Sequence, residues 1–308
     1  MPVDLTVIIP TKDRRDILME SLDHLISSTS HLNAEVLVIN DGVPFEDWNL
    51  TGIGVIKNSH HGVASARNLG ARLAKSDLIL FMDDDMWMTK PAIDRIIWFH
   101  RKNVNSALNV NWVYPEALRK NLEKTAFGRY LNHYGFTTLK GWNRGAIWQA
   151  DQVFQTHGVT SQNLSIGKAT FEHAGGYNEQ FPFAGFEDHE FSARLKSKGV
   201  SVYIDPTVMT YHNEIDRQNI GNWLARKYRS GITRKVGVEM GFKELELKYS
   251  FGKHQVLNVI LAFSTTLKAV VTSNLANRLK QLDLVSFRII GSLLAASIYK
   301  GYTASAKE

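Results

Sequence analysis

Short apolar runs alternate with helical patterns along the first two thirds of the chain. A β-branched apolar run covers residues 5–10, and apolar side chains then recur at helical spacing over residues 17–26. Runs of this length predict buried strands, and apolar positions three or four residues apart predict an amphipathic helix. The same patterns predict strands at residues 35–40, 54–57, 78–82 and 200–204, and helices at residues 64–74, 89–102, 168–174 and 187–198. This order predicts an α/β fold with a mostly parallel sheet covered by helices.

Residues 103–160 interrupt this alternation. The segment is rich in Asn, Trp, Tyr and Gly and has only weak periodicity. We interpret it as irregular structure with short strands that line one side of a cleft.

Composition restricts the chemistry further. The 308 residues include no cysteine, which excludes disulfides, thiolate nucleophiles and cysteine metal sites. Residues 1–5 lack a basic region followed by an apolar stretch, so no secretory signal is predicted there. The expectation is a cytoplasmic protein, with the inner face of the cell membrane as the alternative that the C-terminal region raises.

Charge divides the chain into two expected parts, a domain at residues 1–215 and a basic, partly apolar helical extension at residues 216–308. From residue 217 onward there are 15 Lys and Arg against 5 Asp and Glu. The extension carries apolar runs at residues 256–267 and 289–299, not the interleaved aromatics of a compact basic module, so nucleic acid is not an expected partner. Each run is shorter than the roughly 20 residues that span a bilayer, which favours interfacial membrane contact. A helical subdomain packed on the core remains the alternative.

Polar segments follow three of the predicted strands, at residues 10–14, 40–42 and 83–85. In open α/β sheets, ligands bind beyond the carboxyl ends of the strands. Asp83, Asp84 and Asp85 repel one another unless a cation or hydrogen-bond donors compensate them, and Mg²⁺ or Mn²⁺ would do so through oxygen ligands shared with phosphates. The alternative is a set of capping or turn aspartates.

Two further positions early in the chain are candidates for binding. Asp41 could accept a hydrogen bond from a nucleobase or a ribose, or it could simply form an Asp-Gly turn with Gly42. Arg67, in a helix that follows Gly62, could meet phosphate or a neighbouring carboxylate, or it could be an exposed helix arginine.

Acids and a histidine provide the remaining candidates. Glu187 and Asp188 lie at a predicted helix start, where acids favour the helix dipole, but one of them could also act as a general base. His212, after a strand-like run, could complete a metal site that the aspartates begin.

These segments, in this order, resemble the large inverting glycosyltransferase family 2, which has the GT-A fold with its mixed, mostly parallel sheet. The resemblance covers roughly residues 4–215. It rests on Val7-Ile8-Ile9-Pro10-Thr11-Lys12-Asp13-Arg14, Asn40-Asp41-Gly42, Asn58 to Asn68, Met82-Asp83-Asp84-Asp85, Gly175-Gly176-Tyr177-Asn178-Glu179-Gln180-Phe181 and Gly185-Phe186-Glu187-Asp188.

The resemblance implies a role for each candidate. The implied nucleotide pocket, for uracil or guanine, includes Pro10, Thr11, Asp13, Arg14, Asp41, Arg67, Asp83 and Asp84. The implied metal ligands are Asp83, Asp85 and His212; Asp188, with Glu187, is the implied catalytic base, and Gln162 and Asn163 lie in a loop near the donor sugar and acceptor. Two departures are Asn40, where many members have aspartate, and the absence of Gln-x-x-Arg-Trp after Asp188, which argues for the addition of one sugar at a time.

The implied function is transfer of one sugar from a UDP- or GDP-linked donor to a hydroxyl of a glycan or lipid-linked acceptor, with inversion, in cell-surface polysaccharide, glycolipid or glycoconjugate synthesis. A sugar-phosphate nucleotidyltransferase is an alternative, although residues 10–14 contain no glycine for a phosphate loop. A non-catalytic nucleotide- or glycan-binding protein is another, although it would need no base.

Overall fold

The computed structural model describes residues 2–45, 52–143 and 147–304. The chain forms two compact units, one of residues 1–113 and 143–213 and the other of residues 114–142 and 214–308. The division into one domain at residues 1–215 and an extension at residues 216–308 stays a prediction. No sequence pattern indicated that residues 114–142 would pack with the C-terminal helices.

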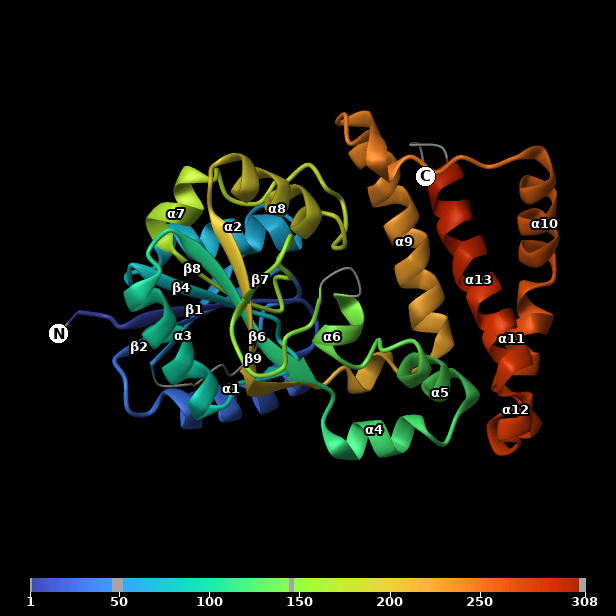
Figure 1. The fold of residues 1–308 in the computed structure, drawn as a ribbon, viewed down its shortest axis with the longest axis horizontal. Coiled ribbons are helices and arrows are strands. Elements are labelled where there is room, and N and C mark those ends of the chain that lie inside the picture. The colour runs from blue at the N-terminus through green and yellow to red at the C-terminus, as the bar shows by residue number, and fades with distance from the viewer. Residues whose placement is uncertain (1, 46–51, 144–146, 305–308) are drawn as a thin grey trace. The chain divides into compact units, whose positions relative to one another are not determined.

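The first unit is built on one mixed sheet with the strand order β3-β2-β1-β4-β8-β6-β9-β5, and β7 pairs with β9 (Figure 1). The strands are β1 (Leu5–Thr11), β2 (Ala34–Asn40), β3 (Ile53–Lys57), β4 (Leu78–Met82), β5 (Met86–Trp87), β6 (Ser106–Val113), β7 (Phe154–Gln155), β8 (Asn163–Gly167) and β9 (Ser201–His212). The helices are α1 (Arg15–Thr29), α2 (Val63–Leu73), α3 (Lys90–Lys102), α7 (Lys168–His173) and α8 (Glu187–Ser197).

Parallel pairing determines which residues meet at one edge of this sheet. Strands β3, β2, β1 and β4 are parallel, and β9 is parallel to β6. Strand β8 is antiparallel to both β4 and β6, so β9 runs in the same direction as β4. The carboxyl ends of β1, β2, β4 and β9 therefore lie at the same edge, together with the start of β8.

Helices cover both faces of the sheet. One core cluster packs Ile8, Phe81 and Ile166 of the strands against Phe171 of α7 and Phe191 of α8, and α2 covers the same face (Figure 1). Helices α1 and α3 cover the other face. Fully buried strands of this kind form because apolar β-branched runs lose contact with water on both faces.

The fold class is confirmed, and the predicted strands and helices of the first unit are confirmed within a few residues, except that the strand predicted at residues 200–204 continues to residue 212 as β9. The interpretation of residues 103–160 was wrong in part, because β6 is an eight-residue buried strand and helices follow it. Strand β6 contains Asn109, whose buried side chain donates to the Thr160 carbonyl and accepts from its amide at 2.7 and 3.1 Å. Polar side chains satisfied inside the sheet hid the strand from a hydropathy pattern.

The second unit is helical. Its helices are α4 (Glu116–Leu122), α5 (Ala126–His133), α6 (Leu139–Trp142), α9 (Ile220–Glu239), α10 (Phe251–Ala262), α11 (Ser264–Thr272), α12 (Asn274–Arg278) and α13 (Asp283–Thr303), with short 3₁₀ turns at Ile215–Arg217, Lys243–Leu245 and Lys280–Leu282. Helix α13 packs along α9 and contributes buried Phe287, Ile290 and Leu293.

Helix α13 is longer than the apolar run at residues 289–299 suggested. The segment Lys280–Thr303 is long and apolar enough to cross a membrane by length and composition, and α10 with α11 passes the same test as a pair bent by 64°. A core helix meets the same criteria, and α13 has a buried face against α9.

Candidate active site

The predicted ligand-binding edge of the sheet brings three acidic and polar segments together. Thr11 ends β1, and its hydroxyl donates to Oδ2 of Asp84 at 2.7 Å, immediately beyond β4. The amide of Asp41, directly after β2, donates to the Thr11 carbonyl at 2.8 Å. These contacts follow from the parallel register of β1 with both neighbouring strands.

The three aspartates after β4 have different partners. Asp83 accepts from Arg67 at 3.0 Å, Asp84 accepts from Thr11 and Arg14, and Asp85 accepts from the Arg14 Nη2 at 2.8 Å. Burial, together with the negative charge of Asp85, raises the pKa of Asp84 to about 7 despite the opposing effect of Arg14. The triplet therefore holds more negative charge than its protein donors compensate.

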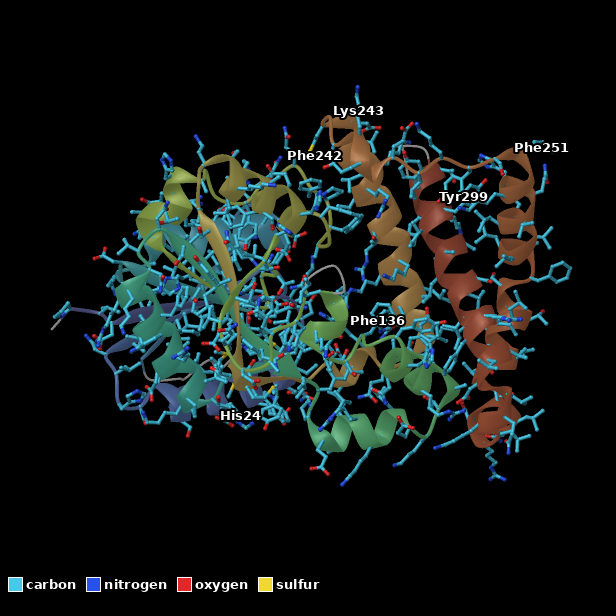
Figure 2. The ribbon with its side chains drawn as sticks, viewed as in Figure 1. His24, Phe136, Phe242, Lys243, Phe251 and Tyr299 are labelled. Atoms are coloured by element: carbon cyan, nitrogen blue, oxygen red, sulfur yellow. The ribbon has the colours of Figure 1, made fainter. Side chains whose placement is uncertain are left out.

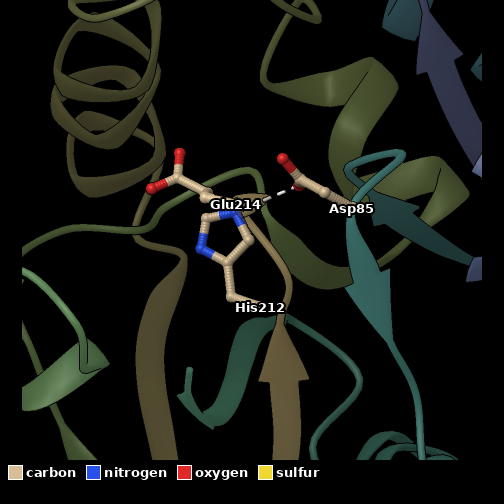
Figure 3. Close-up of side chains that lie close together, drawn as sticks. All are labelled: Asp85, His212 and Glu214. Atoms are coloured by element: carbon tan, nitrogen blue, oxygen red, sulfur yellow. Dashed lines mark hydrogen bonds and ion pairs between the residues drawn. The ribbon is translucent and has the colours of Figure 1, made fainter. Parts of the chain in front are cut away.

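A candidate metal group forms where β9 ends beside β5. Strand pairing aligns Met86 with His212, so the imidazole Nε2 lies 3.0 Å from Oδ1 of the fully buried Asp85 (Figure 3). The edge of the buried Trp112 ring orients the imidazole, with ring centroids 4.9 Å apart. Glu214, two residues further along the chain, completes a group whose ligand atoms all lie within 4.8 Å of one another.

The chemistry of this group fits a hard divalent cation. The Asp85 carboxylate oxygen and the His212 imidazole nitrogen, which share a 3.0 Å hydrogen bond, are close enough together to bind one cation in place of that hydrogen bond. Carboxylate oxygen with imidazole nitrogen also suits Mn²⁺. Glu214 is already engaged, because it accepts from Tyr114 and from Arg217 and Arg226, both at 3.0 Å. Asp85 and His212 are therefore the core of the candidate site, and Asp83 faces Arg67 instead.

The loop after β1 is held in an unusual conformation. Asp13 has a positive φ of 53°, and its Oδ1 accepts from the Val43 amide at 2.9 Å. A Cβ atom on Gly42 would lie 2.3 Å from that Oδ1, so only glycine fits there. Arg14 follows directly, and its guanidinium reaches Asp84 and Asp85. Pro10 is buried within β1 and orients this loop.

Asp41 connects the ends of β2 and β3. Its Oδ1 accepts from Asn58 at 2.8 Å and from the Gly62 amide at 3.2 Å, while its Oδ2 lies 3.5 Å from Lys12 Nζ. The departure at Asn40 also has a structural reason, because its side chain accepts from the Gly42 amide and donates to the Val43 carbonyl, both at 2.8 Å. Asp41 thus holds residues 58–62 with one carboxylate oxygen and faces a cation with the other.

Arg67 links the aspartates to helix α8. Its buried guanidinium donates to Asp83 at 3.0 Å and to Glu187 at 3.1 Å, 120 residues away in the sequence. Burial alone would lower the pKa of Arg67, but the negative charges of Asp83, Asp188 and Glu187 outweigh it and raise the pKa. The sequence left open whether Arg67 meets phosphate, meets a carboxylate or is exposed. In the structure it is buried and contacts carboxylates.

The two adjacent acids at the start of α8 differ in environment. Glu187 is buried and is held by Arg67 and by the Gly185 amide at 2.5 Å. Asp188 accepts from the Ser161 amide at 3.1 Å and from the Ser161 hydroxyl, which lies 2.7 Å from the Tyr177 hydroxyl. Burial and the charge of Glu187 raise the pKa of Asp188 to about 7, against the opposing effects of Arg67 and Ser161. Asp188 is therefore suited to exchange a proton near neutral pH.

Gln162 and Asn163, which were predicted near the donor sugar and acceptor, differ in what their side chains contact. Asn163 is fully buried, and its amide nitrogen donates to the Val110 carbonyl at 2.9 Å, so its side chain links strands. The carbonyl of Gln162 accepts from the Asp83 amide at 3.0 Å, and its side-chain Oε1 is a buried acceptor without a partner among the described residues. Gln162 keeps its place beside the triplet, whereas the geometry gives Asn163 an internal role.

Sequence reasoning missed Ser161, Tyr177 and Glu214. Tyr177 lies in the Gly-Gly-Tyr segment, and Ser161 directly precedes the loop at Gln162, so both positions were next to recognised motifs. No sequence pattern indicates that they meet Asp188, since 16 and 27 residues separate Ser161 from its two partners.

Comparisons with known proteins agree with this geometry. The model for glycosyl transferase family 2 matches residues 6–155, and that for the N-terminal domain of galactosyltransferase matches residues 151–216. The O-antigen biosynthesis protein RfbC of Myxococcus xanthus is 24% identical over 229 residues, 68% of this chain and 17% of the relative. Chondroitin synthase of Pasteurella multocida is 26% identical over 269 residues, 76% of this chain and 27% of the relative. The chain thus spans less than a third of these two proteins.

A third relative has a similar length. It is WfaP of Escherichia coli, a UDP-Glc:alpha-D-GlcNAc-diphosphoundecaprenol beta-1,3-glucosyltransferase, which is 21% identical over 80% of this chain and 91% of its own.

Two solved structures share the fold at low sequence identity. The mannosyltransferase PcManGT from Pyrobaculum calidifontis, in complex with GDP-Man and Mn²⁺, has a TM-score of 0.56 and 13% identity over 99% of this chain and 89% of its own. GalNAc-T7 with UDP, GalNAc and Mn²⁺ has a TM-score of 0.53 and 14% identity over 69% of this chain and 44% of its own.

Fold and relatives together define the class of protein, a glycosyltransferase with the GT-A fold. Within that class, residues 6–155 match glycosyltransferase family 2, the family that the motifs predicted.

Proposed function

We propose that the chain transfers one sugar from a nucleotide-diphosphate donor to an acceptor hydroxyl, with inversion, in the synthesis of a cell-surface polysaccharide or glycolipid. The observation that carries this proposal is the position of Arg67, which joins Asp83 of the triplet to Glu187, the neighbour of Asp188. A leaving-group end and a base end are thereby fixed in one framework. The named activities of the relatives in O-antigen and chondroitin synthesis support the choice of product.

The donor end comprises the loop after β1, Asp41 and the triplet. Asp41 would contact the base or ribose, and Asp13 shapes the loop that faces the nucleotide. Asp85 and His212 would hold Mg²⁺ or Mn²⁺, which when bound supplies positive charge that stabilises the departing diphosphate. Arg14 adds a guanidinium at the same place. UDP- and GDP-sugars are the donors that we propose.

The acceptor end depends on Asp188. Its carboxylate takes the proton from the acceptor hydroxyl while that oxygen bonds to the anomeric carbon. The bond from the anomeric carbon to the diphosphate oxygen breaks, and the nucleoside diphosphate leaves with the electron pair. A single attack opposite the leaving group inverts the configuration. The Ser161 hydroxyl, held by Tyr177, keeps the carboxylate of Asp188 in position.

A donor panel tests the proposal. Purified protein is incubated with UDP-, GDP- and dTDP-sugars and a lipid-linked acceptor, with Mg²⁺, Mn²⁺ or excess chelator, and nucleoside diphosphate release is measured. We expect release with one donor class, loss of release in chelator, and inverted configuration at the anomeric carbon by proton NMR. Full activity in chelator would reject the metal, and a retained configuration would reject the single displacement.

The acceptor that we propose is lipid-linked, and the apolar surface of the second unit supports this choice. Nine of the 19 exposed large hydrophobic side chains in the described residues lie between Phe251 and Val285 (Figure 2 labels Phe251). Residues 247–282, which hold seven of the nine, contain five Lys and Arg and no acid. Exposed apolar side chains with only positive charges among them suit the surface of an anionic membrane. We therefore propose peripheral contact at the inner face of the cell membrane.

Vesicle flotation tests the membrane contact. Phe251→Ser with Val259→Ser removes two exposed apolar side chains of α10 without touching its buried Leu257. We expect the double variant to bind phosphatidylglycerol vesicles several-fold more weakly than the parent protein. Val104→Ser, an equally exposed change in the first unit, is the matched control. Equal flotation of all three proteins would reject the contact.

A further inference from the structure

Lys227 on α9 is a half-buried cation that rests on aromatic rings. Its Nζ lies 5.7 Å from the Trp223 ring centroid and 5.9 Å from that of Phe136 (Figure 2 labels Phe136). Within residues 2–45, 52–143 and 147–304, no hydrogen bond or carboxylate partner of Lys227 occurs. Burial, followed by the charges of Arg226 and Arg234, lowers the pKa of Lys227 to about 8.

The neighbouring cations increase the positive charge at this place. Arg226 lies over the rings of Trp142 and Trp223, at 5.6 and 5.9 Å, and its acidic partner Glu214, at 3.0 Å, is shared with Arg217. Arg234, seven residues after Lys227, donates to the Leu245 carbonyl at 3.2 Å.

Helix α9 offers little compensation of its own. It contains five Lys and Arg and a single acid, Glu239, at its last residue. Another acid of the second unit, Asp283, is occupied by bidentate contacts from Arg129 at 2.7 to 3.1 Å.

Ring contact by itself does not explain this cluster. A cation over an aromatic face is attracted by the ring, and that attraction needs no second cation nearby. Lys300 shows the simple case, because it is exposed and lies 5.8 Å from the Tyr228 ring. Lys227 differs because it is half-buried beside Arg226 and Arg234, and like charges so placed repel unless an anion joins them.

We propose that Lys227 and Arg226, between the rings of Phe136, Trp142 and Trp223, form a binding site for the phosphate groups of a diphosphate-linked lipid acceptor. Guanidinium and ammonium groups are the donors that recognise phosphate, and aromatic walls reduce competition from water. The acceptor class rests on the proposed function. It also agrees with the name of the relative WfaP, whose acceptor is a diphosphoundecaprenol.

Calorimetry with soluble anions tests the site in the full chain. Excess chelator removes metal-dependent binding of diphosphate at the aspartate triplet. Inorganic pyrophosphate and farnesyl diphosphate are then titrated into the parent protein, Lys227→Met, Lys227→Arg and the matched control Lys300→Met. We expect binding that Lys227→Met weakens about tenfold or more, since a hydrogen bond to a charged group contributes about 1.5–3 kcal/mol.

The control and the conservative variant decide between outcomes. Lys300→Met should bind as the parent does, and Lys227→Arg should retain most of the affinity, which shows that loss in Lys227→Met is not misfolding. Equal affinity of Lys227→Met and the parent, or no binding of either diphosphate at millimolar concentration, would overturn the site. Lys227-dependent binding to phosphatidylglycerol vesicles without binding of the soluble diphosphates would overturn the acceptor assignment and indicate a membrane headgroup.

Steady-state kinetics separate this inference from the proposed function. We expect Lys227→Met to raise KM for a lipid-diphosphate acceptor about tenfold and to leave kcat and the hydrolysis of donor by water unchanged. Lys227-dependent pyrophosphate binding in a protein that uses no donor would leave the site intact and reject the function. Sugar transfer by Lys227→Met with an unchanged acceptor KM would overturn the site and leave the proposed function standing.

Discussion

The two units of the chain treat buried charge in opposite ways. In the described part of the first unit, the guanidinium groups of Arg14 and Arg67 pair with four carboxylates, those of Asp83, Asp84, Asp85 and Glu187, and the charge of Arg67 also acts on a fifth, that of Asp188. In the second unit, Lys227 and Arg226 lie on aromatic rings, and Arg226 shares the carboxylate of Glu214 with Arg217.

The difference is the basis for the ligand that we propose for each region. A cluster with an excess of carboxylates binds a cation or raises the pKa of its acids, and both Asp84 and Asp188 have a pKa raised to about 7. A cluster with an excess of cations lowers the pKa of a lysine or binds an anion, and the pKa of Lys227 is lowered to about 8. A metal and a donor diphosphate suit the first region, and an acceptor phosphate suits the second.

The largest effect on activity is expected from Asp85→Asn, which removes one negative charge from the carboxylate cluster of the first unit. A metal contributes several kcal/mol to stabilising the leaving group, so kcat should fall roughly 1000-fold. Mn²⁺ affinity, measured by electron paramagnetic resonance without nucleotide, should fall in parallel. Asp94→Asn, an exposed carboxylate on α3, is the control and should change neither quantity. Unaltered Mn²⁺ binding by Asp85→Asn would mean that another group holds the metal.

Arg67→Met should have the largest effect on stability. The substitution leaves the buried carboxylate of Glu187 without its guanidinium partner, and breaking a buried ion pair in this way costs about 3–5 kcal/mol. Urea denaturation at pH 7 measures the loss. Arg72→Met in the last turn of the same helix is the comparison, since no acidic partner of Arg72 occurs in the described part of the chain. Similar unfolding midpoints for both variants would contradict the central role of Arg67.

Asp188→Asn should reduce kcat about 100-fold or more while donor affinity changes little, because general base catalysis contributes at least that factor. In the parent protein the rate should rise with pH through about 7 and then level off, since Asp188 must be ionised to accept a proton. The raised pKa has the opposite effect on stability. Protonated Asp188 stabilises the folded protein, fully so below the pKa of this group in the unfolded chain, and this contribution is lost as pH rises through about 7. Asp188→Asn should therefore not lower the unfolding temperature at pH 8. A rate independent of pH between 5 and 8 would assign the base elsewhere.

Glu214→Gln is expected to have the smallest effect, and it tests where the boundary of the metal group lies. Because Glu214 accepts from Arg217 and Arg226, its loss should cost about 1 kcal/mol of stability. Mn²⁺ affinity should change less than about threefold in the same variant. A loss of Mn²⁺ affinity as large as that of Asp85→Asn would instead make Glu214 a ligand.

Local patterns predicted much of the first unit. The apolar runs at β1, β2 and β4 are continuous, and the polar residues that follow each strand were recognisable as ligand-binding positions. Strand β6 was missed because the polar Asn109 and Asn111 lie in it, and the side chain of Asn109 is satisfied by Thr160, a partner distant in sequence. The helices at residues 116–142 were also missed, and the packing that selects them lies within the second unit.

The sequence by itself determined the fold class, the family and the acidic triplet, because strand-forming runs and the residues at their ends are encoded within a few positions of one another. Tertiary structure decided the partners of each acid and the direction in which its pKa is shifted. Adjacent Glu187 and Asp188 look alike in sequence, yet Arg67 neutralises the first while burial raises the pKa of the second. The pairing of Asp85 with His212, 127 residues apart, likewise required strand β9 to return to β5. The groups that compensate a buried charge are neighbours in space, and a pattern along the chain does not record which distant residues become neighbours.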